Sequence, residues 1–259
     1  MKAATRWFLS LVAASLVVSC RPEPPADPNA ADVRTNAIGA DTMLKSLSWM
    51  SDQVNERQAK GLITEEEGKT ALTRYAARLV GRIDRAQVKP GDAWKVATVL
   101  LTAKKWKEAE TMLVTAVSHA VAVKDEDRRV NDTLRLARAK AELGKVKEAI
   151  ATAKKAFDAS DINSAPLLPA TLLEIVPAAQ GKGADADLAK LLEMAISAHR
   201  RTKVDPESAA GRAFLSAKWF HIENGWKRAI QLYQEAGRED LARAAALRAE
   251  KMLVNFRRA

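Results

Sequence analysis

Residues Thr133 to Ala156 read TLRLARAKAELGKVKEAIATAKKA and carry the strongest fold signal in this chain of 259 residues. Apolar side chains recur at helical spacing on both sides of Gly144, which favours two helices joined by a tight turn. The chain past Lys89 is equally rich in Ala, Leu, Lys, Arg and Glu, with almost no alternation of β-branched residues. The pattern predicts an all-α fold.

The pattern of residues 133–156 returns in three other segments, at 93–116, 172–195 and 213–236. In each segment a small or apolar residue occupies the same place, near the start of the second helix. These residues are Ala109, Ala149, Leu188 and Ala229, spaced 40, 39 and 41 residues apart. A regular step of this size indicates helix pairs that stack and bury a face against their neighbours.

The segments resemble the tetratricopeptide repeat, a helix-turn-helix unit that stacks into an α-α superhelix. The resemblance lies in the second-helix openings, which read KWKEA at 105–109, GKVKEA at 144–149 and GWKRA at 225–229. It implies that small residues meet near each turn and that larger residues fill the seams between pairs. The small residues are Ala97, Ala109, Ala137 and Ala149, and the larger ones are Leu113, Phe220 and Tyr233. The period near 40 in place of 34 leaves an irregular helical bundle as the alternative.

The third segment departs from the pattern for a visible reason. Pro177 lies within its expected first helix, where it removes a backbone donor and crowds the preceding turn, so a kink is predicted there. Gly181-Lys182-Gly183 follows as a predicted loop.

Further helices flank the repeats, which occupy residues 90–237 of a helical domain at 33–259. An atypical N-terminal helix pair is predicted at 41–87, as residues 41–60 and 64–86, and Thr64 with Glu67 forms a capping box for the second helix. Residues 238–257 predict a C-terminal helix. Stacked pairs need such ends, because an end unit otherwise exposes the face meant for a neighbour.

The N-terminus is built like a bacterial export signal. Lys2 and Arg6 precede an apolar run of 12 residues, which is shorter than the roughly 20 that a membrane-spanning helix needs. Val17-Val18-Ser19-Cys20 resembles the lipobox of bacterial lipoproteins. The resemblance implies that residues 1–19 are removed and that Cys20, the only cysteine, receives acyl chains such as palmitate. An ordinary cleaved signal that leaves Cys20 as a free thiol is the alternative.

Residues 20–32 contain four prolines and no large apolar residue, which is typical of a semi-rigid tether between a membrane and a domain. By resemblance to lipoproteins, Arg21 after the cysteine favours the periplasmic face of the outer membrane over the inner membrane. The formal charge is +10, and loss of Lys2 and Arg6 with the signal leaves +8. An exported basic protein is expected to meet anionic lipid, acidic glycan or acidic protein, and not nucleic acid.

The sequence contains no recognisable catalytic or metal motif, so no enzyme activity, metal or cofactor is expected. His119, His199 and His221 have no metal-ligand spacing. Glu207-Ser208 resembles a dipeptide of lytic transglycosylases, which break down peptidoglycan. The structural interpretation is stronger, because Asp205 suits an N-cap, Pro206 suits the first helical position and Glu207 suits the first turn.

A partner is expected to bind on the concave surface that the first helices of successive repeats would line. Repeat positions carried over residue by residue mark Trp94, Thr98, Asn131, Arg135, Arg138, Phe214, Lys218 and His221. This mixture of cations and aromatic rings suits an extended peptide with acidic side chains. The sequence therefore predicts a non-catalytic, lipid-anchored scaffold for another cell-envelope protein, in an oligomeric state that it leaves open. The alternatives are a peptidoglycan-active enzyme or its regulatory subunit, and a structural lipoprotein without a dedicated partner.

Overall fold

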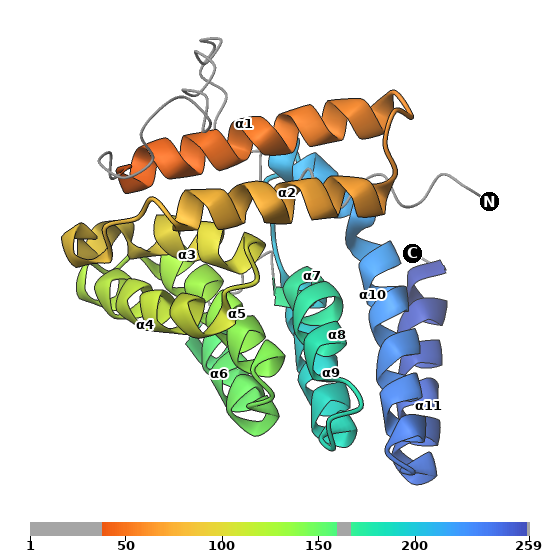
Figure 1. Ribbon diagram of the computed structural model, residues 1–259. Coiled ribbons are helices and arrows are strands. Elements are labelled where there is room, and N and C mark those ends of the chain that lie inside the picture. Colours follow the sequence, from red (N-terminus) through yellow and green to blue (C-terminus); the bar gives the residue numbers. More distant parts are fainter. Residues whose placement is uncertain (1–37, 160–166, 258–259) are drawn as a thin grey trace. The chain divides into compact units, whose positions relative to one another are not determined.

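The computed structural model describes residues 38–159 and 167–257, and every element in those ranges is a helix (Figure 1). The prediction of an all-α fold is therefore confirmed. The chain forms two compact units that divide between Met112 and Leu113, within helix α4 (Trp106–Ala122). The predicted signal peptide, Cys20 and the tether at 20–32 lie outside the described residues.

The first unit is built on α1 (Ala40–Ala59), α2 (Glu65–Val80) and α3 (Ala93–Thr102), with short 3₁₀ turns η2 (Arg85–Gln87) and η3 (Pro90–Asp92) between α2 and α3. Figure 1 shows α1 and α2 lying side by side, and both pack against α3. Their shared core contains Met43, Leu47, Tyr75, Ala76, Leu79, Val99 and Ala103. The amphipathic faces of three helices thus close around one cluster.

The capping box predicted at Thr64 is present. The Glu67 backbone N–H donates to Thr64 Oγ1 at 3.2 Å, and the Thr64 backbone N–H donates to Glu67 Oε2 at 2.7 Å. These two bonds satisfy donors that would otherwise be unpaired at the helix start. The other end differs from the prediction, because α2 ends at Val80 and not near Ala86.

The predicted turn between α3 and α4 is also present. After α3 the chain turns through Lys104, whose φ is +56°, and α4 begins at Trp106 as the KWKEA motif predicted. Lys104 N–H donates to Leu101 O at 3.0 Å and Lys105 N–H to Leu100 O at 2.9 Å, which is the Schellman pattern of a helix C-terminus. Ala97 and Ala109 are both fully buried, as the repeat alignment predicted.

The second unit continues with α5 (Glu126–Glu142), α6 (Val146–Ala159), α7 (Leu167–Ala170), η4 (Thr171–Ile175), α8 (Val176–Ala179), α9 (Asp185–Arg201), α10 (Ala209–Glu235) and α11 (Glu239–Arg257). The turn between α5 and α6 places Gly144 at φ +76°, a conformation that costs glycine little. Ala137 and Ala149 on either side of it are fully buried. The pair α5–α6 therefore forms the helix-turn-helix unit predicted from residues 133–156.

The irregularity predicted at Pro177 takes the form of a wide helical turn. Residues Thr171–Ile175 are π-helical, and the Val176 N–H donates to the Thr171 carbonyl five residues before it. Pro177 has no N–H to donate to the turn before it, and its ring crowds that turn, so the ladder widens just ahead of the proline. The predicted loop at Gly181-Lys182-Gly183 follows, and α9 then places Leu188 in the core.

The fourth predicted helix-turn-helix, at 213–236, is wrong. Residues Ala209–Glu235 form one continuous helix, and Gly225 lies inside it. A Cβ on Gly225 would lie 2.9 Å from Ile196 Cγ1 and 3.2 Å from Leu168 Cδ1, so this glycine allows close packing of helices and does not form a turn. Phe220, predicted to fill a seam, is 49% exposed. The partner of α10 towards the C-terminus is α11, the predicted C-terminal helix.

The start of α10 also differs from the prediction. Asp205 is not the N-cap, because the helix begins at Ala209 and the Ser208 hydroxyl accepts a hydrogen bond from the Gly211 N–H at 2.9 Å. Asp205 instead stabilises the preceding turn, where its Oδ1 accepts from the Glu207 N–H at 3.0 Å. Both members of the Glu207-Ser208 dipeptide thus take part in local backbone structure.

Candidate functional site

Three of the predicted groove residues lie on α5, spaced so that they share a face. Asn131, Arg135 and Arg138 are four and three residues apart, and all three are half-buried. Arg138 Nη1 donates to Glu174 Oε2 at 3.0 Å, and Glu174 lies on the π-helical segment η4. The widened turn ahead of Pro177 therefore presents a carboxylate to the cationic face of α5.

Asp132 is a buried carboxylate that sequence analysis did not single out. It is 0% exposed, and neither of its oxygens has a hydrogen-bond partner. Arg135 on the same helix places its Nη1 3.6 Å from Asp132 Oδ1. Burial raises the pKa of Asp132 to about 6, against the smaller opposing effect of Arg135. Burial also lowers the pKa of Arg135, so the two groups share an environment that disfavours both charges.

The remaining groove residues predicted in the second unit lie around His199, which the predicted set of groove residues omitted. They are Phe214, Lys218 and His221. The His199 ring lies 4.7 Å from the Phe214 ring and 5.8 Å from the His221 ring, between centroids. Lys218 Nζ lies 5.5 Å from the centre of the Phe214 ring and donates to Thr202 O at 3.3 Å. We call these four residues, which join the end of α9 to the start of α10, the histidine junction.

The helical spacing of apolar residues along α9 is a sequence signal that could have predicted the burial of His199. Leu188, Leu192, Ala195 and Ile196 form its buried face, and His199 continues that face by one more turn. Its side chain is 1% exposed, and neither ring nitrogen has a hydrogen-bond partner. Burial lowers the pKa of His199 to about 4, with smaller contributions from His221 and Lys218.

Trp94 and Thr98 belong to the first unit and have local contacts there. Thr98 Oγ1 donates to the Trp94 carbonyl at 2.9 Å, and Lys95 Nζ lies 5.8 Å from the centre of the Trp94 ring. The eight predicted groove residues therefore fall into three local sets, on α3, on α5 and in the histidine junction. A single groove through all eight stays a prediction.

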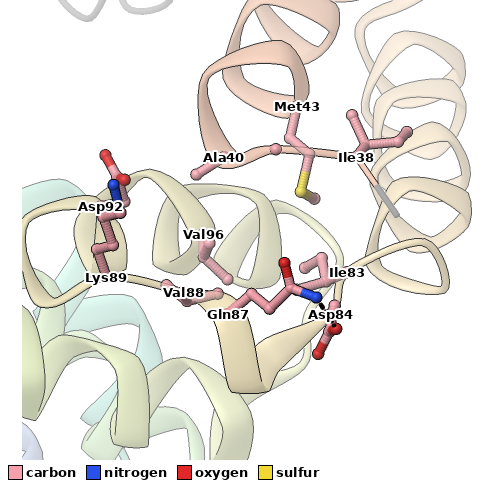
Figure 2. Close-up of a pocket in the computed structure, with 11 residues that line it drawn as sticks. Ile38, Ala40, Met43, Ile83, Asp84, Gln87, Val88, Lys89, Asp92 and Val96 are labelled. Carbon is pink, nitrogen blue, oxygen red and sulfur yellow. Dashed lines mark hydrogen bonds between the residues drawn. The ribbon is translucent and has the colours of Figure 1, made fainter. Parts of the chain in front are cut away.

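The first unit contains a pocket of about 170 Å³, shown in Figure 2. Met43, Ile83 and Val96 supply apolar surface to it, and Asp84 and Asp92 lie among its polar residues. Both carboxylates already have partners, since Gln87 Nε2 donates to Asp84 at 2.7 Å and Lys95 Nζ to Asp92 at 2.6 Å. The pocket thus offers apolar contact with no unpaired acidic group, and no predicted site residue lines it.

Within residues 38–159 and 167–257, His, Cys, Asp and Glu side chains form no group of three that could hold a metal ion. In the same ranges, none of the helices combines the length and apolar character that crossing a bilayer requires.

Comparison with known proteins adds no family assignment. No protein-family model matches this chain, and no curated protein matches it.

Proposed function

We propose that this protein is a lipid-anchored scaffold of the bacterial cell envelope, which binds another envelope protein or peptide and carries out no catalysis. In this proposal Cys20 carries the acyl chains, the tether at 20–32 spaces the helical domain from the periplasmic face of the outer membrane, and the domain is a tetratricopeptide-like superhelix. The export signal and lipobox-like cysteine support the location, and the helix pairs support binding as the role.

The repeat interpretation is supported by three consecutive helix pairs. In α3–α4, α5–α6 and the pair formed by α7, η4 and α8 with α9, the equivalent residues Ala109, Ala149 and Leu188 are all fully buried. The continuous α10 departs from the pattern after them. In a tetratricopeptide-like superhelix, stacked helix pairs would present one face of their first helices as an extended binding surface.

The observation that carries the proposal is the ion pair between Arg138 and Glu174. It joins two half-exposed side chains, 33% and 42% exposed, on neighbouring elements. A guanidinium that binds a carboxylate of its own chain at the surface has the geometry to bind an acidic side chain of a partner. We therefore assign the partner an acidic segment, and Arg138 with Arg135 the role of contacting it.

No second function is proposed. The peptidoglycan-active alternative depended on Glu207-Ser208, and the Ser208 hydroxyl serves as the N-cap of α10.

The experiment is affinity capture from native membranes with the full-length protein as bait. Arg138→Glu is expected to lose the captured partner, because the cation that receives its acidic segment becomes an anion. Glu174→Gln is expected to increase capture, because the competing internal carboxylate is gone. The control is Lys190→Glu, a charge reversal at an exposed position on α9, the second helix of its pair. This variant is expected to leave capture unchanged. Identical capture by the parent and Arg138→Glu contradicts the proposed surface.

A further inference from the structure

The N-terminal part of α10 has little to hold it except the histidine junction. Within residues 209–218 only Gly211 is buried, and Leu215 is 44% exposed. Trp219 is partly buried and packs against the main core of this unit, and the helix then contributes Ile222, Trp226, Ala229, Leu232 and Tyr233 to that core. The free energy that holds residues 209–218 in place therefore comes mainly from Phe214, Lys218 and the packing against His199.

The titratable groups of the histidine junction, His199, Lys218 and His221, are all bases. His199 lies between Phe214 and His221 of α10, and Lys218 is the ammonium group that acts on it. Arg200, the next residue on α9, lies close enough to Lys218 to lower the pKa of that group further, after burial. Helix α7, which also packs on α9, contains only Leu, Pro and Ala, and Lys154 and Lys155 of α6 are not among the groups that act on His199.

A proton on His199 therefore has no compensating charge in the closed junction. The ring would become a buried imidazolium beside an ammonium group, without a carboxylate to accept its hydrogen bond. Opening the junction exposes the ring to water, where a proton is accepted at the ordinary pKa of histidine.

We propose that residues 209–218 of α10 form an acid-sensitive latch on the end of α9, which opens locally when His199 takes up a proton. The helix stays anchored from Trp219 onwards by its core residues, so opening exposes Phe214 and the end of α9 without unfolding the unit. This inference is independent of the proposed scaffold function, because it depends only on contacts within the second unit.

The expected effect of pH on latch opening follows from the pKa of His199 in the closed and in the open junction. Its pKa is about 4 in the closed junction and 6.5 when exposed, so the open state binds more protons between these values. Stability of the closed latch is complete above pH 6.5 and is lost as pH falls from 6.5 to 4. Between pH 7.5 and pH 5 the equilibrium constant for opening should rise about 30-fold.

The test is amide hydrogen exchange of the full-length protein at pH 7.5 and pH 5, corrected for the intrinsic effect of pH on exchange. Peptides from residues 209–218 should lose about 30-fold in protection relative to peptides from α6. His199→Leu should abolish that difference, and His119→Leu, a histidine of α4 outside the junction, should preserve it. Equal relative protection at both pH values in the parent, or an unchanged difference in His199→Leu, overturns the proposal.

A second measurement needs no variant and covers the case in which His199→Leu fails to fold. Titration of the histidine ring signals by NMR should give a His199 pKa below 5 in the parent protein. A His199 pKa of 6 or above would show that the ring is protonated without cost in the closed junction and would refute the latch.

Discussion

At the scale of single residues, the unusual groups of this protein are buried and titratable. Asp132 and His199 are almost completely removed from water, and neither forms a hydrogen bond. Each is therefore held in its neutral form over a wider pH range than in an unfolded chain. The pH dependence that each group gives to stability has the opposite sign. Asp132 is an acid whose pKa is raised, so it lowers stability as pH rises, whereas His199 is a base whose pKa is lowered, so it lowers stability as pH falls.

Asp132 should destabilise the folded protein at neutral pH. Its folded pKa of about 6 exceeds the ordinary 3.8, so the native state retains a proton that the unfolded chain releases, and stability falls as pH rises through that window. We expect Asp132→Asn to raise the free energy of unfolding at pH 7.5 by about 1–3 kcal/mol and to have little effect below pH 4. Urea denaturation at both pH values measures this.

The control for that change is Asp52→Asn, at an exposed position within α1, which should shift stability by less than about 0.5 kcal/mol. A loss of stability in Asp132→Asn at pH 7.5 would mean that the ionised carboxylate contributes a favourable interaction with Arg135 that outweighs its burial.

At the scale of helices, several helix C-termini end in the same turn geometry, which is formed by different residues. Gly61, Gly144 and Gly237 each follow a helix at positive φ, and each helix end closes with the Schellman pair of hydrogen bonds. Lys104 and Lys124 occupy the equivalent positions after α3 and α4, with φ of +56° and +58°. A side chain is strained in this conformation, so these two turns are less favourable than the three glycine turns.

Lys104→Gly should therefore stabilise the protein by about 0.5–1 kcal/mol, because the turn keeps its geometry and loses its strain. The matched opposite change is Gly144→Lys, which should destabilise it by about 1 kcal/mol through backbone strain alone, since no atom lies within 4 Å of a Cβ built there. Thermal or urea unfolding measures both. A destabilising Lys104→Gly would show that the lysine side chain contributes contacts worth more than the strain.

At the scale of the whole molecule, the proposed arrangement is a helical domain carried on a lipid. Acyl chains on Cys20 should place the full-length protein in the detergent phase of a phase-partition experiment, because each buried methylene contributes about 0.8 kcal/mol. Cys20→Ser should move it to the aqueous phase. Arg21→Asp keeps the cysteine and should still partition into detergent, which separates loss of the lipid from any other change near the tether. Equal partitioning of Cys20→Ser and the parent would contradict lipid anchoring.

The spacing of small residues was enough to find the first three helix pairs. Ala109, Ala149 and Leu188 are buried as the period predicted, because the face that a helix buries repeats along the sequence itself. The same reasoning failed at Gly225, since a glycine before Trp226 is locally indistinguishable from the Gly144 turn. Ile196 and Leu168 lie against Gly225 from other helices, and that contact has no trace in the neighbouring sequence.

The sequence by itself determined the helical class, the capping box at Thr64, an irregularity of the helix at Pro177 and the turns within the pairs α3–α4 and α5–α6. These features depend on residues within a few positions of one another. The tertiary structure alone decided that α10 continues through Gly225, that Asp132 is buried without a hydrogen bond and that His199 meets Phe214, Lys218 and His221. The physical reason is that burial and pKa depend on side chains brought together from distant segments, and helical periodicity describes only one helix at a time.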